Sequence, residues 1–328
     1  MKTELNKLNE MLGEVPEVFI CMASYEDRCL SVAQQLDISN LKYAIVLWNS
    51  DYSNSIKDNL FKLESKFGEK VKKSELRTDA PLFVADKLRE EVISIIKETA
   101  GLCLVDITTF THEQLLILIK LLAELAPEKK IKLTYTGAGD YSINFEGTEK
   151  WLSRGVAQIR TVLGYPGIMF PSKKLHLIVL VGFESERAEQ LIINSEPALV
   201  SLGLGRKHQS VAPQHYEVNA AFHEGVKHFT EEISNQFDSV RQFQFSCLDP
   251  LQTMKDIFKE IEDTDGYNVV ICPLNTKPST IGAALAAFKS EQIQLVYVQP
   301  IEYNTDGYST SSDSCSIFDF TELLSLIK

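Results

Sequence analysis

Short apolar runs alternate along this chain with longer segments in which apolar residues recur every three or four positions. The short runs have the length of strands and the longer segments have the period of helices, an alternation that is typical of βαβ units. In the first half the predicted strands are 17–22, 43–48, 71–76, 102–107 and 131–136, and the predicted helices are 26–35, 55–67, 81–99 and 112–125. In the second half the predicted strands are 175–181, 198–202, 242–247, 268–273 and 293–299, and the predicted helices are 185–194, 219–235, 250–262 and 279–290. Each half therefore predicts a parallel, doubly wound α/β sheet of the Rossmann type.

The two halves match at four landmarks in the same order. Both have a first strand that leads into an aromatic residue, a glutamate and then an arginine. Both also have an acidic N-cap and a proline in the first turn of the third helix. Loops after the fourth and fifth strands match as well. The matched positions are Tyr25-Glu26-Asp27-Arg28 with Phe183-Glu184-Ser185-Glu186-Arg187, Asp79-Ala80-Pro81 with Asp249-Pro250, Asp106–Thr109 with Cys272–Thr276, and Tyr135 and Asp140-Tyr141 with Tyr297 and Asp306-Gly307-Tyr308. We infer two tandem Rossmann-like domains that arose by internal duplication.

Residues 1–150 form the first predicted domain, 151–172 a connecting segment and 173–328 the second domain. Within the connection, Leu152, Val156, Ile159 and Leu163 have helical spacing, which predicts one more amphipathic helix. The Ser/Thr/Asp-rich stretch 305–316 predicts a loop, and 318–327 predicts a closing helix.

Charge and composition narrow the classes of partner. The 328 residues carry a net charge of -12, which argues against extended contact with duplex nucleic acid because such contact requires a basic face. There is no signal-peptide pattern and no apolar run long enough to span a membrane. The six cysteines form no C-x-x-C pair, and several lie in apolar strands, as expected of free thiols in a reducing compartment. A cytoplasmic protein without membrane contact is expected.

Polar residues gather where the predicted strands end, which in an open parallel sheet is the edge that binds ligands. Hydroxyl, amide, cationic and aromatic side chains at this edge suit a nucleotide or another small anionic ligand, and Lys277 at a helix start is the first choice for a phosphate. The candidate binding residues of the first domain are Ser24, Tyr25, Glu26, Arg28, Asp106, Thr108, Thr109, Asp140 and Tyr141. Those of the second domain are Glu184, Arg187, Asn275, Thr276, Lys277, Ser279, Tyr303 and Tyr308.

Structural roles compete with binding at several of these positions. Thr108 and Asn275 can cap the helices that follow them, and Glu184 and Arg187, three apart, can pair on a helix surface. His223 and His228 are five residues apart, which places them poorly for one zinc ion, so no metal site is expected. No cofactor motif follows any predicted strand, and no catalytic residue is assigned.

One resemblance extends this interpretation. The segment Asn275-Thr276-Lys277, which opens a small-residue helix, resembles the Asn-x-Thr-Gly-Gly-Thr-Lys loop of CRISPR-associated Rossmann-fold (CARF) sensor domains, and Asp106-Ile107-Thr108 resembles their Asp-Leu-Thr loop. A chain with two such halves resembles the SAVED type of sensor. The resemblance implies binding of cyclic oligonucleotides or related nucleotides between two Rossmann units, in antiphage defence. Because the sequence shows no nuclease motif and no extra helical domain, a partner protein as effector, or a role as a subunit of a larger complex, is expected.

Three function classes stay open at this point. The first is a nucleotide sensor that acts through a partner. The second is an enzyme acting on a nucleotide or phosphorylated substrate, with Lys277 and Arg187 holding phosphate and Glu184 or Asp106 as acid or base. The third is a scaffold subunit without a working ligand site. The absence of the two adjacent glycines of the CARF loop favours this class.

Overall fold

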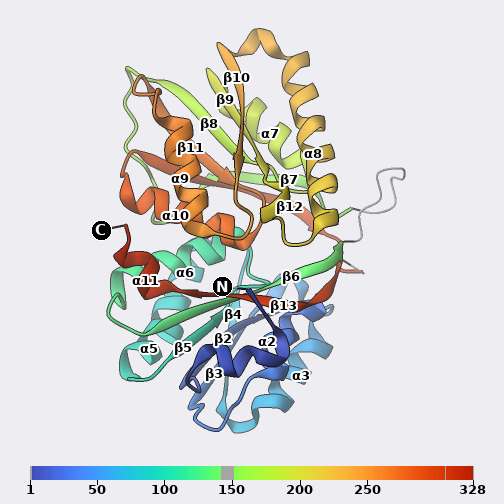
Figure 1. Ribbon diagram of the computed structural model, residues 1–328, viewed down its shortest axis with the longest axis vertical. Coiled ribbons are helices and arrows are strands. Elements are labelled where there is room, and N and C mark those ends of the chain that lie inside the picture. Colours follow the sequence, from blue (N-terminus) through green and yellow to red (C-terminus); the bar gives the residue numbers. More distant parts are fainter. Residues whose placement is uncertain (1, 142–150, 307, 328) are drawn as a thin grey trace. The chain divides into compact units, whose positions relative to one another are not determined.

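The computed structural model describes residues 2–141, 151–306 and 308–327 (Figure 1). It divides into two compact units. Unit 1 consists of the described residues of Met1–Ser142 together with those of Thr305–Lys328, and unit 2 consists of the described residues of Ile143–Asn304. Each unit is a mostly parallel sheet flanked by helices, so the predicted α/β class with two Rossmann-like sheets is confirmed.

The sheet of unit 1 has the strand order β1-β13-β6-β5-β2-β3-β4. Its strands are β1 (Lys2–Glu4), β2 (Val18–Ala23), β3 (Tyr43–Asn49), β4 (Val71–Leu76), β5 (Cys103–Asp106), β6 (Ile131–Tyr141) and β13 (Ser309–Asp319). The five strands from β6 to β4 are parallel, whereas β13 runs antiparallel to β6 and β1 antiparallel to β13.

The sheet of unit 2 has the strand order β10-β9-β8-β11-β12-β7. Its strands are β7 (Ser153–Thr161), β8 (Lys174–Leu180), β9 (Leu199–Gly205), β10 (Ser239–Phe245), β11 (Tyr267–Pro273) and β12 (Ile293–Tyr303). The five strands from β10 to β12 are parallel, and β7 closes the sheet as an antiparallel edge strand.

Helices cover both faces of each sheet (Figure 1). In unit 1 they are α1 (Leu8–Leu12), α2 (Ser31–Gln35), α3 (Lys57–Phe67), α4 (Pro81–Lys87), α5 (Ser94–Glu98), α6 (His112–Leu125) and α11 (Phe320–Ser325), with a π-helical turn η5 (Leu88–Ile93) between α4 and α5. In unit 2 they are α7 (Ser185–Ser195), α8 (Pro213–Glu232), α9 (Pro250–Ile261) and α10 (Lys277–Lys289). Helices α1 to α3 share a buried cluster with one face of the first sheet, and α7 and α8 do so with one face of the second.

Both units have the same topology. Numbered from the first parallel strand of each unit, the parallel strands lie in the order 5-4-1-2-3 in both sheets. The order reverses between the first and fourth strands, which are β2 and β5 in unit 1 and β8 and β11 in unit 2. This reversal is where doubly wound sheets open toward ligands.

Each sheet also contains one antiparallel strand that follows the last parallel strand of the other sheet in sequence. Strand β7 follows β6 in sequence, yet it pairs with β12 in unit 2; β13 follows β12, yet it pairs with β6 in unit 1. The two halves thus exchange their last strands. The compact units consequently differ from the predicted domains 1–150 and 173–328, because 305–328 belongs to unit 1 and the connecting segment 151–172 belongs to unit 2.

Two local predictions are wrong. The predicted helix in 151–163 is the strand β7, in which Gly155 has φ of 64°. A left-handed residue is incompatible with a continuous helix, and as a half-buried edge strand β7 lacks the clear alternation that marks a strand. The predicted loop 305–316 largely becomes β13, whose hydroxyl-rich sequence is held between β1 and β6. The predicted closing helix is present as α11.

Candidate functional site

The loop after the fourth parallel strand is bonded to the first strand in both units. In unit 1 the Thr109 hydroxyl donates to the carbonyl oxygen of Met22 at 2.6 Å, and in unit 2 the Asn275 amide donates to that of Val181 at 2.6 Å. A Cβ on Gly182 would lie only 1.9 Å from the carbonyl oxygen of Leu274, so the two loops of unit 2 are in direct backbone contact. Two of the predicted binding residues thus bridge the point where the strand order reverses.

Side-chain capping hydrogen bonds use the polar groups at the N-terminus of α10. Thr276 is the N-cap: its hydroxyl oxygen accepts from the backbone N–H of Ser279, and the hydroxyl donates to the carbonyl of Cys247 at 2.6 Å. Ser279 is fully buried and donates back to the carbonyl of Thr276, while Pro278 has no N–H to offer. Lys277 occupies the first helical position and is half-buried. Thr276 and Ser279 therefore have capping roles in this helix.

Asp106 and Thr108 form a buried pair at the end of β5. The Thr108 hydroxyl donates to Asp106 Oδ1 and accepts from the backbone N–H of Thr136 at 2.9 Å. The other carboxyl oxygen of Asp106 is buried and has no hydrogen-bond partner. Burial raises the pKa of Asp106 to about 7, although the bonds from Thr108 and the charge of Arg28 act in the opposite direction.

A buried glutamate and a buried arginine lie against a half-buried tyrosine in unit 1. The Arg28 guanidinium lies 2.6 Å from Glu26, donates to the carbonyl of Thr136 on β6 at 3.2 Å and lies 5.7 Å from the ring centroid of Tyr141. Burial alone would lower the pKa of Arg28, but the Glu26 carboxylate raises it well above the usual value. The carboxylate and guanidinium therefore form a buried ion pair against the fifth strand.

Unit 2 contains the same cluster at equivalent positions. Arg187 Nη1 lies 2.8 Å from Glu184, Nη2 donates to the carbonyl of Val298 on β12, and the guanidinium lies 5.5 Å from the ring centroid of Tyr297. The hydroxyls of Tyr297 and Tyr303 are 3.2 Å apart. Both units thus join the helix after the first strand to the fifth strand through the same ion pair.

The spacing of the tyrosines shows which residues correspond. Tyr141 follows Tyr135 by six positions, and Tyr303 follows Tyr297 by six positions. The counterpart of Tyr141 is therefore Tyr303, and not Tyr308 as the sequence comparison of the halves assumed. Tyr308 lies in unit 1, just before β13, rather than in the second domain.

Four half-buried tyrosines gather at the C-terminal edge of the unit 1 sheet. The ring centroid of Tyr25 lies 5.9 Å from that of Tyr52 and 5.7 Å from that of Tyr308, and Tyr308 lies 6.2 Å from Tyr141, all in edge-to-face geometry. We call these residues the tyrosine cluster. Tyr52 was not predicted, although its position just after β3, at another C-terminal strand end, is a signal that could have found it.

The remaining predicted residues lie around this edge of unit 1. Ser24 is buried, and its hydroxyl oxygen accepts from the backbone N–H of Glu26 at 3.2 Å. Asp140 is exposed near the end of β6, where its backbone N–H donates to the Thr310 hydroxyl at 2.9 Å. Ser24 therefore shapes the loop after β2, and Asp140 belongs to the pairing of β6 with β13.

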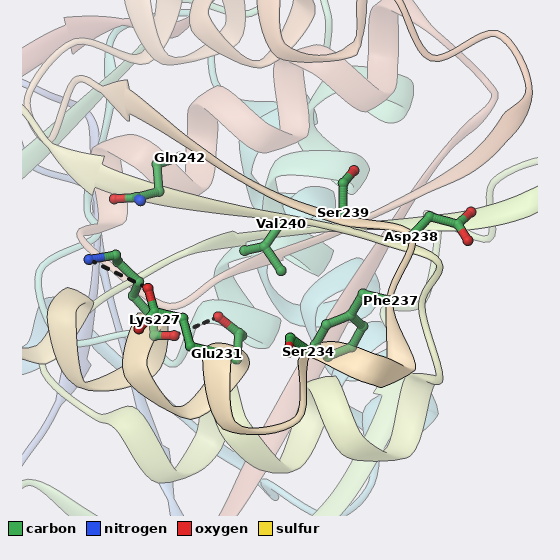
Figure 2. A pocket seen from close by; sticks show the side chains of 9 residues that line it. Lys227, Glu231, Ser234, Phe237, Asp238, Ser239, Val240 and Gln242 are labelled. Carbon is green, nitrogen blue, oxygen red and sulfur yellow. Dashed lines mark hydrogen bonds and ion pairs between the residues drawn. The ribbon is translucent and has the colours of Figure 1, made fainter.

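A cavity of about 340 Å³ lies elsewhere, between the C-terminal end of α8 and the start of β10 (Figure 2). Its charged side chains are engaged with one another and with neighbours: Lys227 pairs with Glu224 and Glu231, and Asp238 pairs with Lys174. Because it lies at the amino-terminal end of β10, it is not part of the C-terminal edge that gathers the predicted residues.

Within the described ranges there is no group of three or more histidine, cysteine or acidic residues placed to hold a metal ion. Over the same residues, no helix combines the length and apolar character needed to cross a membrane. No protein-family model matches the sequence, and the comparison with curated proteins gives no match.

Proposed function

We propose that this protein binds a nucleotide at the C-terminal edge of unit 1, with the tyrosine cluster receiving the base. The observation that carries the proposal is the convergence of Tyr25, Tyr52, Tyr141 and Tyr308 from four separate segments onto one edge. Half-buried aromatic rings offer stacking surfaces for a base, and stacking on such rings contributes about 1–3 kcal/mol per base.

The surroundings favour a small ligand over a long nucleic acid. The chain carries a net charge of -12, which disfavours an extended phosphate backbone. The buried cation of Arg28 lies 5.7 Å from the Tyr141 ring centroid, a favourable cation–π contact. A single nucleotide or a small cyclic oligonucleotide fits these conditions.

The burial and pairing of Asp106 and Glu184 favour binding over catalysis. Asp106 is 1% exposed, and Glu184 is paired with buried Arg187. Neither carboxyl group is placed to exchange a proton with a ligand at the surface. We therefore propose a sensing role, in which a protein partner carries the response, as the resemblance to CARF and SAVED sensors implies.

The test is thermal unfolding of the purified chain with mononucleotides, dinucleotides and cyclic oligonucleotides, followed by mass analysis of each mixture. A bound ligand raises the melting temperature by mass action. An intact ligand after the shift supports a sensor, and a converted ligand makes the protein an enzyme. If no member of the panel shifts the melting temperature, the nucleotide proposal is overturned.

The site itself is tested with Tyr25→Ala. Loss of one stacking ring is expected to raise the dissociation constant of the best ligand by roughly 5- to 150-fold, the equivalent of about 1–3 kcal/mol. Tyr43→Ala is the matched control, because Tyr43 is also half-buried in unit 1 but begins β3 at the opposite edge of the sheet. Equal affinities in the two variants would show that the tyrosine cluster is not the site.

A further inference from the structure

One edge of the unit 2 sheet is an exposed strand. Among the strands that the structure describes, β10 pairs with β9 alone and lies at the end of its sheet. Ser239, Arg241 and Gln242 are exposed, and Val240 has a relative exposure of 36%. The backbone N–H and C=O groups on the outer side of an edge strand can pair with another strand. The outer side of β10 therefore offers a surface for a second chain.

The other three edges of the two described sheets carry features that discourage strand pairing. In unit 1, β1 is only three residues long, and β4 carries Lys72 and Lys73 at exposed positions. In unit 2, β7 contains Gly155 with φ of 64°, and its pairing with β12 has a register shift. It also carries Arg154 and Arg160. Short strands, charged side chains and local irregularities are the usual protection of sheet edges.

Strand β10 lacks each of these protective features. Its sequence over 239–245 contains no glycine or proline, and Arg241 is its one charged residue. All seven of its residues pair with β9 without a register shift. Val240, Phe243 and Phe245 are residue types that favour strands. A regular edge strand of this length without protection is a place where chains associate.

The side chains of β10 are complementary to a second copy of the same strand. In an antiparallel pair related by a twofold axis at Gln242, all seven residues are matched and Gln242 faces its own copy. Arg241 then faces Phe243, a favourable contact of a cation with an aromatic ring, and Val240 faces Gln244. A twofold axis at Arg241 would instead place two guanidinium groups opposite each other, which is destabilising. The self-pairing therefore favours the register centred on Gln242.

The cavity beside β10 suits the side chains that this register brings to it. Val240 and Gln242 line the cavity and point toward α8 (Figure 2). Directly opposite residues of an antiparallel pair share one face, so Gln244 of the second copy lies beside Val240 on the cavity side. Thr230 and Ser234 offer hydroxyl groups in a volume of about 340 Å³, and the charged lining residues already have ion-pair partners. A neutral amide such as that of glutamine fits this lining.

We propose that two copies of this chain associate through antiparallel pairing of their β10 strands about a twofold axis at Gln242. The six-stranded sheets of the two copies of unit 2 then form one continuous sheet. Such a symmetric dimer uses the same surface on both chains. The inference goes beyond nucleotide binding and does not depend on it, because the tyrosine cluster lies in unit 1.

Sedimentation velocity of the purified chain over a range of concentrations tests the association. The expected species at high concentration has twice the chain mass of 36.9 kDa. A monomer at the highest soluble concentration overturns the proposal and leaves the edge to an extended segment of a different protein.

The surface is tested with Gln242→Glu. This variant places two carboxylates opposite each other at the twofold axis, so the dissociation constant of the dimer is expected to rise at least about tenfold. Gln158→Glu is the matched control, because Gln158 is also exposed but lies on β7, at the opposite edge of the same sheet. Circular dichroism establishes that both variants fold. Equal dissociation constants of the two variants place the contact elsewhere and overturn the proposal.

The register is tested with Gln242→Cys under mild oxidation. Directly opposite residues of an antiparallel pair have Cβ atoms about 4.5–5.5 Å apart, near the distance that a disulfide spans, so a cross-linked dimer is expected. The six native cysteines are all buried and leave the introduced thiols as the reactive ones. Gln158→Cys is the control and is expected to stay uncross-linked. A dimer that forms no cross-link in Gln242→Cys, or forms it equally in Gln158→Cys, refutes the pairing about Gln242.

Discussion

Burial determines the role of the charged residues in the two glutamate–arginine pairs. Glu26 and Arg28, like Glu184 and Arg187, are close enough in sequence to be taken for charged side chains on a helix surface. Their side chains are instead largely buried, and each arginine also donates to a carbonyl of the fifth strand. Removing one partner of such a pair leaves an unpaired buried charge, so these pairs fix the position of the helix against the sheet.

Asp106 gives a pH-dependent prediction at this scale. Its pKa of about 7 in the folded state lies above the value of about 3.9 for an unfolded chain. Between these values the folded state keeps a proton that the unfolded state has lost, so the contribution of Asp106 to stability falls as pH rises from about 4 to about 7. Asp106→Asn, which cannot ionise, is expected to gain stability relative to the parent chain over this window, by up to about 4 kcal/mol.

Urea unfolding of both chains at pH 4.5 and pH 8 measures this difference. The parent chain is the control at each pH. A difference in stability between the two chains that is the same at both pH values would contradict the raised pKa of Asp106.

At the level of elements, the loops after the first and fourth parallel strands are held together by close contacts in each unit. At Gly182 the loop after β8 approaches the loop after β11 so closely that any Cβ would overlap the carbonyl oxygen of Leu274. The matching contact in unit 1 is made through the Thr109 hydroxyl. The two loops are thus connected in unit 2 by the contact at Gly182 and the Asn275 amide, and in unit 1 by the Thr109 hydroxyl.

Gly182→Ala is expected to destabilise the protein by at least about 2 kcal/mol, because backbone atoms have to move apart. Gly225→Ala is the matched comparison: Gly225 lies within α8, and an added Cβ meets nothing within 4 Å. Alanine is the better helix former by about 0.8–1 kcal/mol, so this variant is expected to be more stable than the parent chain. Urea denaturation of the parent chain and the two variants measures their free energies of unfolding. A Gly182→Ala variant as stable as Gly225→Ala would rule out the backbone contact.

Across the whole molecule, the exchange of the last strands makes unit 1 depend on a distant part of the chain. Residues after 304 complete the sheet that begins near the amino terminus, and β7 completes the sheet of the second half. Unit 1 is therefore built from two segments of the chain, whereas unit 2 is one contiguous segment. A chain cut between the two predicted domains would therefore separate strands that belong to one sheet.

Phe320→Ala tests this dependence. Phe320 is 1% exposed at the start of α11, and its loss is expected to cost about 3–5 kcal/mol. Because α11 belongs to unit 1, amide hydrogen exchange is expected to accelerate in β2 and β5 while β8 and β11 keep their protection. Faster exchange in unit 2 with unit 1 unchanged would contradict the strand exchange.

The alternation of apolar runs was enough to predict the α/β class, the ten parallel strands and most helices. These features depend on local periodicity, and periodicity is a property of the sequence. Helix α6 begins and ends at the predicted residues 112 and 125, because a threonine N-cap and a long apolar period mark it clearly.

Tertiary structure alone decided where the exchanged strands pair and which polar residues are buried. Strands β7 and β13 each follow a strand of one unit and hydrogen-bond to the other, and no local pattern specifies a partner that lies more than a hundred residues away. For the same reason Tyr308 was assigned to the second half. The sequence determined which residues could act at the sheet edges; packing determined that unit 1 gathers four tyrosines and that unit 2 leaves Ser153, Glu184 and Arg187 with unsatisfied atoms, since burial and pairing depend on contacts between distant segments.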